Sequence, residues 1–331
     1  RNQKIVPYHE ELKKSGACFG VSGGYERPMW FAKNGEIAEY KYSYNYQNWY
    51  PSAEFETKNT RENIGLFELT PFSKYDLEGK TVHEELQKIC TANIKKEIGK
   101  CTYTQMLNED GGIETDLTVV SLKEDKYRII TAAANREHDK FHIKKYLSEN
   151  IKISDVTDDY CVLGVFGPKS RDLMKDLSSD DYSNENFKFG TAKYVKINES
   201  KVWTQRLSYV GELGYELYIE KANAREIYNI CKDYYHWVNK NYDIPADSKM
   251  LFNMGKCQGI LETTGKIMST LCAERKMNVN INKQLTAKLE GVKTISLVRE
   301  YIFVASSIEN IQKYSAQNLL TKILSKKWPC R

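Results

Sequence analysis

A glycine turn between two alternating segments constrains the fold of this chain more than any other feature of its sequence. The first segment is YTQML (103–107), and the second is IETDLTVVSL (113–122). The turn between them contains Asp110, Gly111 and Gly112. Two strand-like runs joined in this way are typical of a β-hairpin. The sequence therefore predicts an antiparallel pair of strands at this point.

Helical and strand patterns alternate along the rest of the first 243 residues. Thr81 and Glu84 stand at the positions of a helix cap and its capping box. Periodicity predicts helices at 54–63, 81–93, 168–177 and 223–238, and strands at 65–69, 74–79, 126–135, 161–167 and, around a glycine bend, 201–220. We therefore expect a mixed α/β (α+β) chain.

Length and composition suggest three regions. The 331 residues are enough for two or three domains. Residues 1–52 are rich in aromatic residues and glycine, so we expect loops and short turns that lie against the rest of the protein. Residues 53–243 would form the core, and residues 244–331, with their weak periodicity, would form a separate, divergent region.

Charge and motif content exclude several classes of protein. A net charge of +5 is too small to indicate a nucleic-acid or membrane binder, and a mean hydropathy of −0.60 without a long apolar run argues against a membrane span. The 8 Cys form no CxxC pair, so we expect buried thiols rather than zinc ligands or disulfides. His138 and His142 have helical spacing without a third ligand nearby, so we expect an exposed helical face and no metal site. No dinucleotide, P-loop or GxSxG motif occurs.

Two acidic residues share one face of the second hairpin strand. Alternation places Glu114 and Asp116 on one side and Ile113, Leu117 and Val119 on the other. If the acidic face lined a cavity, the pair could orient an amine or relay a proton. The alternative is a solvated strand face, on which acids are ordinary.

A second candidate site lies in SYVGELGYELYIE (208–220). Glu212 and Glu216, together with Tyr209 and Tyr215, flank a bend at two glycines. A carboxylate accepts two parallel hydrogen bonds well, and an aromatic ring can stack on a flat heterocycle. Together they would suit a planar ring with NH and NH2 groups on one edge, such as a pterin. The alternative is a bulged strand whose glutamates face water.

Several long blocks that occur in order resemble one family. They are GACFG, GGYERPMWFA, GLFELTPFSKYDLEG, YTQMLNEDGGIETDLTVVSL, DVTDDYCVLGVFGPKSRDLM and LSYVGELGYELYIE. Together they resemble the C-terminal half of the dimethylglycine dehydrogenase and sarcosine dehydrogenase family. That half is similar to the glycine cleavage T-protein, an aminomethyltransferase. The resemblance covers about residues 10–243.

The resemblance implies a fold, a cofactor and a set of roles. The fold would be a T-protein-like ring of three domains with antiparallel sheets and packed helices around tetrahydrofolate, its C-terminal barrel-like domain degenerate or truncated here. The folate would capture a one-carbon unit, derived from a methylamine, as 5,10-methylenetetrahydrofolate. Asp116 would be the catalytic carboxylate beside the folate nitrogens, and Glu114 would modulate it. Tyr209, Glu212 and Glu216 would bind the folate.

The sequence also departs from the family. The N-terminal flavin domain, which would hold FAD, is not in this chain, and the start at Arg1 leads us to expect a piece of a longer protein. The stretch 244–270 keeps almost none of the family block expected there, including its arginine. Two alternatives therefore stay open. One is a non-catalytic subunit resembling the regulatory subunit of pyruvate dehydrogenase phosphatase, and the other is a free-standing aminomethyltransferase. We expect a flavin domain or partner subunit, no nucleic-acid or membrane partner, and a location in the mitochondrial matrix, or the cytoplasm of a prokaryote.

Overall fold

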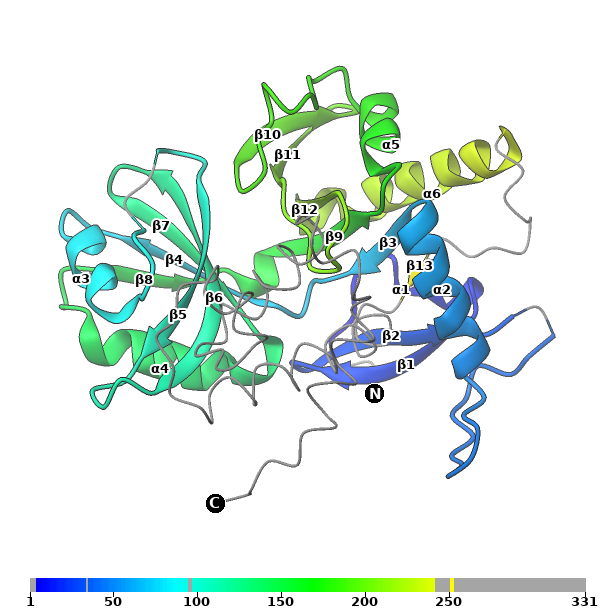
Figure 1. Ribbon diagram of the computed structural model, residues 1–331, viewed down its shortest axis with the longest axis horizontal. Coiled ribbons are helices and arrows are strands. Elements are labelled where there is room, and N and C mark those ends of the chain that lie inside the picture. The colour runs from blue at the N-terminus through cyan, green and yellow to red at the C-terminus, as the bar shows by residue number, and fades with distance from the viewer. Residues whose placement is uncertain (1–3, 34, 95–96, 242–250, 253–331) are drawn as a thin grey trace, which may run out of the picture. The chain divides into compact units, whose positions relative to one another are not determined.

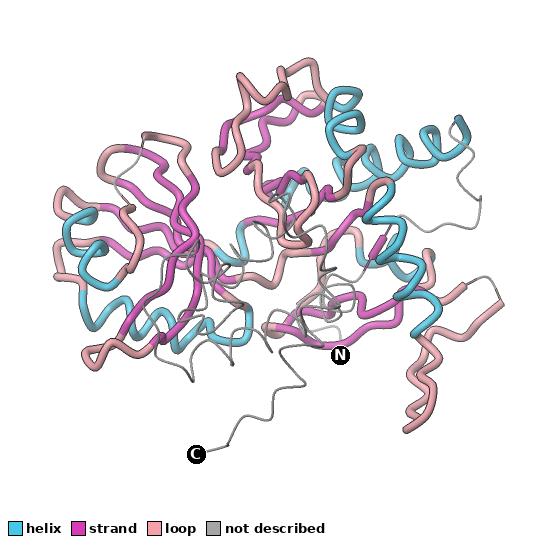
Figure 2. Tube along the Cα trace, in the orientation of Figure 1, coloured by secondary structure: helices cyan, strands magenta, loops and turns pink. Residues whose placement is uncertain are grey.

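The computed structural model describes residues 4–33, 35–94, 97–241 and 251–252, all within one compact unit, Arg1–Cys257. Their strands form a two-stranded, a five-stranded and a six-stranded sheet (Figures 1 and 2). Neighbouring strands are antiparallel except for the pair of β3 (Gly65–Glu68) with β13 (Leu251–Phe252). The expected mixed α/β fold with antiparallel sheets is confirmed for these residues. The predicted region 244–331 lies outside them, apart from β13.

The five-stranded sheet contains the predicted hairpin. Its order is β5-β6-β7-β4-β8, and α3 and α4 pack on one face (Figure 1). Tyr75, Leu77 and Ile129 point from the sheet into a core that includes Leu86 of α3 and Ile143 of α4. The elements are β4 (Ser73–Glu78), α3 (Val82–Ile89), β5 (Cys101–Leu107), β6 (Ile113–Lys123), β7 (Lys126–Thr131), α4 (Arg136–Tyr146) and β8 (Lys152–Asp155).

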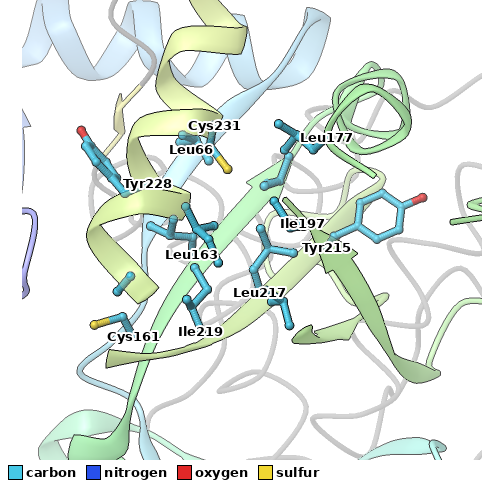
Figure 3. Packing of buried hydrophobic residues seen from close by; sticks show 14 of the residues in the cluster. Leu66, Cys161, Leu163, Leu177, Ile197, Tyr215, Leu217, Ile219, Tyr228 and Cys231 are labelled. Carbon is cyan, nitrogen blue, oxygen red and sulfur yellow. The ribbon is translucent and has the colours of Figure 1, made fainter. Parts of the chain in front are cut away.

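The six-stranded sheet has the order β10-β11-β12-β9-β3-β13. Figure 3 shows Leu163 and Leu217 of this sheet gathered beside Tyr228 and Cys231 of α6 in one hydrophobic core. Burial of such side chains is the main favourable contribution to folding. The remaining elements are β9 (Tyr160–Phe166), α5 (Ser170–Leu177), β10 (Ala192–Ile197), β11 (Ser200–Gln205), β12 (Gly214–Glu220), α6 (Ala224–Asn241), and the 3₁₀ turns Ala133–Asn135, Thr157–Asp159 and Lys221–Asn223.

The N-terminal region differs from the loops and short turns expected for residues 1–52. It contains α1 (His9–Lys14) and a hairpin of β1 (Ala17–Ser22) and β2 (Tyr25–Phe31), followed by α2 (Tyr50–Glu62). The glycines caused the error: Gly23 and Gly24 have φ of 57° and 83° and form the hairpin turn rather than interrupting structure.

Backbone contacts join the edge strands of the two larger sheets. Lys100 and Thr191 form an antiparallel bridge, and the N–H of Cys101 donates to the carbonyl of Gly190 at 2.9 Å. The N–H of Ala192 donates to the carbonyl of Gly99 at 2.6 Å. These bonds fix the start of β5 against the start of β10.

Two local predictions can be compared with the structure. Thr81 stands at the N-cap of α3, but its hydroxyl donates to Glu85 at 2.6 Å instead of capping the helix. The expectation of buried thiols is confirmed for the cysteines in the described part of the chain, namely Cys18, Cys90, Cys101, Cys161 and Cys231. No helix in that part is long and apolar enough to cross a membrane.

Candidate functional site

Polar side chains of the five-stranded sheet lie on the face opposite to α3 and α4. Asp76 on β4 pairs in register with Arg128 on β7, whereas their neighbours Tyr75 and Leu77 point into the helical core. Arg128 donates to Asp76 from Nε at 2.6 Å and from Nη2 at 3.0 Å. The alternation of faces puts Lys74 on the same side. This face is therefore both polar and largely buried.

The predicted acidic residues lie on β6. Asp116 is on this same face, whereas Glu114, at a register shift between β5 and β6, contacts His138 of α4. Thr115, Leu117 and Val119 are buried, while Asp116 is exposed and Glu114 half-buried. Ile113, expected with the apolar set, is 50% exposed because it follows directly on the turn. The hydroxyl of Tyr103 donates to Asp116 at 2.6 Å. Asp116 is thus held by a tyrosine at the exposed end of the face.

Glu114 contacts a histidine rather than Asp116. Its Oε2 lies 3.2 Å from Nε2 of His138, and its Oε1 accepts a hydrogen bond from Asn108 at 2.9 Å. A hydrogen bond to buried Asp139 raises the pKa of His138, and the charges of Asp139 and Glu114 act in the same direction. His138 therefore places positive charge beside Glu114 over a wider pH range than a free histidine.

Of the two histidines expected on an exposed helical face, only His138 is exposed. His138 is accessible, but His142 is 7% exposed and one ring nitrogen lies 3.2 Å from the carbonyl of Leu107. His142 is buried because α4 turns it towards the end of β5. Within the described ranges no three His, Cys, Asp or Glu residues form a metal-binding group.

Glu216 on β12 lies directly opposite Gln205 on β11. The hydroxyl of Tyr218, two residues further along the same face, donates to Glu216 Oε2 at 3.0 Å. Part of the Glu216 side chain is accessible, but protein atoms surround the carboxyl closely. This burial raises its pKa to about 7, against the lowering effects of Tyr218 and of the charge of Lys74. Glu216 is thus poised to change charge near neutral pH.

Lys74 is a fully buried lysine whose charge acts on two carboxyl groups, those of Glu68 and Glu216. Its side chain is 0% exposed, and Nζ donates to the carbonyls of Thr70 at 2.9 Å and Phe72 at 2.5 Å. Burial lowers its pKa to about 7, although the charge of Glu68 opposes the shift. The charge of Lys74 lowers the pKa of both Glu68 and Glu216, against the raising effect of their burial.

Tyr209 and Glu212 occupy the loop between β11 and β12. Tyr209 is 38% exposed, and its ring meets the edge of Phe72 with centroids 6.2 Å apart. Glu212 forms an ion pair with Arg61 of α2. The sequence had grouped Tyr215 with these residues, but Tyr215 is fully buried in the core of the six-stranded sheet.

The predicted residues therefore fall into four groups of contacts: Asp116 with Tyr103, Glu114 with His138, Glu212 with Arg61, and Tyr209 and Glu216 around Phe72 and Lys74. The sequence analysis missed Tyr103 and Lys74. The hairpin register could have revealed Tyr103, because it places Gln105 opposite Asp116 and Tyr103 two residues along the same face. Nothing in the sequence around Lys74 indicates burial.

Comparisons with known proteins define the class to which this arrangement belongs. The chain matches the family described as the GCVT N-terminal domain over residues 8–232, and it belongs to that family. It is 36% identical over 219 residues to 4-methylaminobutanoate oxidase (formaldehyde-forming) of Paenarthrobacter nicotinovorans, a match that covers 66% of this chain and 27% of that protein. It is 31% identical over 221 residues to mitochondrial dimethylglycine dehydrogenase of Rattus norvegicus, covering 66% of this chain and 26% of that protein.

The chain thus spans about a quarter of the length of these relatives. A solved structure, the glycine cleavage system aminomethyltransferase T of Bartonella henselae, superimposes with a TM-score of 0.56 at 22% identity, over 69% of this chain and 56% of that one. The likeness confirms a T-protein-like fold. The resemblance to the dimethylglycine dehydrogenase family, drawn from the sequence blocks, is also confirmed.

Proposed function

We propose that this chain is the tetrahydrofolate-binding part of an enzyme that oxidises an N-methyl amine, and that it captures the released one-carbon unit as 5,10-methylenetetrahydrofolate. Membership of the GCVT family supports the proposal. The names of the two relatives support it further, since one forms formaldehyde and the other acts on dimethylglycine. The oxidation itself would require a flavin domain or partner subunit. The mitochondrial relative supports a location in the mitochondrial matrix.

The observation that supports folate binding most is the arrangement of Glu216 and Gln205. Glu216 offers a carboxyl whose Oε2 is held by Tyr218. The amide of Gln205 is 0% exposed, and neither its oxygen nor its nitrogen has a hydrogen-bond partner among the described residues. Such orphaned buried groups are rare and call for an explanation. A reduced pterin, with adjacent NH and NH2 groups, would suit the acceptors on this face, and the half-exposed ring of Tyr209 could stack on it.

Asp116 would serve the reacting end of the folate. The folate supplies nucleophilic nitrogens that accept the one-carbon unit. The exposed carboxylate of Asp116, fixed by Tyr103, would stabilise the cationic iminium electrostatically and accept the proton that leaves the nitrogen. Glu114, paired with His138, would adjust the field at Asp116. Glu212 would position the Tyr209 loop through its ion pair with Arg61.

Equilibrium binding of tetrahydrofolate to the full chain, measured anaerobically by calorimetry, tests the proposal. We expect saturable binding that weakens roughly tenfold or more in Glu216→Gln and Asp116→Asn, since each change removes a charge-assisted contact. Asp125→Asn, at an exposed turn, is the matched control and should leave binding unchanged. Absence of saturable binding would overturn the proposal, as would unchanged binding in both site variants. A stable protein partner without folate binding would support the regulatory alternative instead.

A further inference from the structure

Four side chains of α4 contact the tip of the β5–β6 hairpin, residues 107–114. Their spacing puts them on one face of the helix, and they are His138, His142, Lys145 and Tyr146. A ring nitrogen of His142 lies 3.2 Å from the carbonyl of Leu107. Lys145 and Tyr146 contact Glu109 at 3.0 Å and 3.2 Å. The hairpin tip is therefore fastened to α4 along the length of the helix.

Glu114 reaches α4 because it is the extra residue of a β-bulge. Thr115 lies opposite Met106, and the next pair in the register joins Ile113 to Leu107. This register leaves Glu114 unpaired on β5. A bulge bends its strand and re-aims a side chain. Here it directs the carboxylate to α4 instead of across the sheet.

His138 contacts two carboxylates, one with each ring nitrogen. Its Nε2 lies 3.2 Å from Oε2 of Glu114, and its Nδ1 lies 3.0 Å from Oδ1 of Asp139. A neutral imidazole carries only one N–H, so only the imidazolium can donate to both carboxylates at once. Loss of one proton from His138 must therefore break one of the two hydrogen bonds.

The difference in burial decides which hydrogen bond is lost. Asp139 is 0% exposed, and its other hydrogen bond, from the hydroxyl of Thr115, is 3.4 Å long. Glu114 is partly exposed to water and also accepts from Asn108 at 2.9 Å. A buried charge left without a donor costs more than an accessible one. The neutral ring of His138 would therefore keep its proton on Nδ1 and lose its contact with Glu114.

The other charged groups near His138 do not replace this contact. The ring of His142 stacks on His138 with centroids 6.5 Å apart, so a second positive charge there would oppose the first. Arg136 is paired with two aspartates near the end of β8. The ion pair of Glu109 with Lys145 lowers the pKa of the carboxyl and raises that of the amine, so both stay charged while His138 titrates. Neutralisation of His138 would thus loosen the bulge without detaching the hairpin tip.

We propose that His138 is a positioning residue, which as an imidazolium fastens the bulge at Glu114 to α4 and so holds the start of β6. Asp116 follows the bulge by two residues on this strand. A rise in pH that neutralises His138 would therefore loosen the strand end that carries Asp116. The link to Asp116 rests on the proposed folate binding, whereas the contact of His138 with the bulge does not.

Nitrogen NMR of the histidine side chains between about pH 5 and about pH 9 tests this contact. We expect the pKa of His138 to lie above its ordinary value of 6.5, and the neutral ring to carry its proton on Nδ1. Glu114→Gln should lower the pKa of His138, because it removes one of the two carboxylate charges. A neutral ring protonated on Nε2, or a titration that Glu114→Gln leaves unchanged, would overturn the contact.

Amide hydrogen exchange at Gly111 and Gly112 measures how firmly the hairpin tip is held. From about pH 6 to about pH 9, their protection in the wild type, corrected for the chemical exchange rate, should fall roughly three- to tenfold, because one hydrogen bond is lost. His138→Gln should abolish this pH dependence. Lys144→Gln, at an exposed position of the same helix, is the matched control and should retain it. The same pH dependence in wild type and His138→Gln would overturn the positioning role.

Anaerobic calorimetry with tetrahydrofolate tests the link to Asp116. At about pH 6, His138→Gln should weaken binding roughly two- to fivefold, and at about pH 9 it should bind like the wild type. If His138→Gln binds like the wild type at both pH values, the link to Asp116 is overturned while folate binding stands. If the wild type does not bind tetrahydrofolate, the proposed function and the link to Asp116 both fail, and NMR and hydrogen exchange alone decide the contact of His138.

Discussion

At the scale of single residues, the main feature is a set of ionisable groups buried between polar partners. Glu216 and Lys74 each have a pKa of about 7, one raised and the other lowered by burial. The two groups attract each other, but neither forms a direct ion pair in the described residues. Burial without full pairing costs stability and is typical of functional sites. A hydrophobic core alone would not require either residue.

The raised pKa of Glu216 has a direct consequence for stability. A carboxyl whose pKa rises from 4.5 to about 7 on folding stabilises the protein fully below pH 4.5, and this contribution is lost as the pH rises through 7. Glu216→Gln removes the titrating group. Between pH 5 and pH 7.5, the free energy of unfolding of the wild type should therefore fall relative to the variant, by up to roughly 3 kcal/mol.

Urea denaturation of both proteins at the two pH values measures this difference. Glu199→Gln, at an exposed carboxylate, is the control and should follow the wild type. An identical pH dependence in wild type and Glu216→Gln would show that Glu216 is not buried as described.

At the scale of elements, a buried ion pair joins β4 and β7, and Lys126 of β7 adds a longer contact of 3.5 Å to Asp76. Asp76 and Arg128 are opposite each other in register, and Tyr160 lies with its ring 4.6 Å from the guanidinium carbon. Both charged side chains are about nine-tenths buried or more. Removing one partner leaves the other charge buried and uncompensated, which is more costly than removing both.

Asp76→Leu and Arg128→Met should each destabilise the chain by roughly 3–5 kcal/mol, and the double variant should lose clearly less than the sum of the two. The measurement is a double-mutant cycle in chemical denaturation. Lys196 and Glu199, an exposed pair, provide the comparison and should contribute less than about 1 kcal/mol. Additive losses at Asp76 and Arg128 would contradict the proposed energetic coupling.

Elements formed by local signals were predictable from sequence, and those formed by distant contacts were not. The hairpin of β5 and β6 was predictable because the alternating pattern and the glycine turn at Gly111 are both local features of the sequence. The hairpin of β1 and β2 was missed because its glycines suggested only breaks. The cap at Thr81 was wrong in detail, since the side chain of Glu85 competes for the hydroxyl.

At the scale of the whole described unit, the contact between β5 and β10 depends on a glycine. Gly99 has a φ of 84°, and a Cβ there would lie 2.5 Å from the carbonyl oxygen of Ala192. Gly111 has a similar φ of 77°, but no atom lies within 4 Å of the Cβ position. A substitution at Gly111 would therefore cause backbone strain alone, whereas one at Gly99 would cause both backbone strain and a steric clash with Ala192.

Gly111→Ala should cost roughly 1–2 kcal/mol through backbone strain alone. Gly99→Ala should cost at least about 1 kcal/mol more, because overpacking adds to the strain. Thermal and chemical denaturation of both variants measure the difference. Equal losses would mean that the contact between Gly99 and Ala192 is not tight.

The candidate site shows how far the sequence could lead. The motifs identified Asp116, Tyr209 and Glu216, because each lies in a long recognisable block. The contact of Tyr209 with Phe72 could not be predicted, since the two residues are far apart in sequence and meet only in the folded chain. Burial of Lys74 likewise depends on contacts that no local pattern encodes.

The structure of the full chain in complex with tetrahydrofolate tests the central claim most directly. The account predicts a pterin whose NH and NH2 groups lie about 2.6–3.2 Å from the Glu216 carboxyl, with Tyr209 against the ring and Asp116 at the reacting nitrogens. A folate bound elsewhere, with the Glu216 carboxyl contacting only protein, would contradict it.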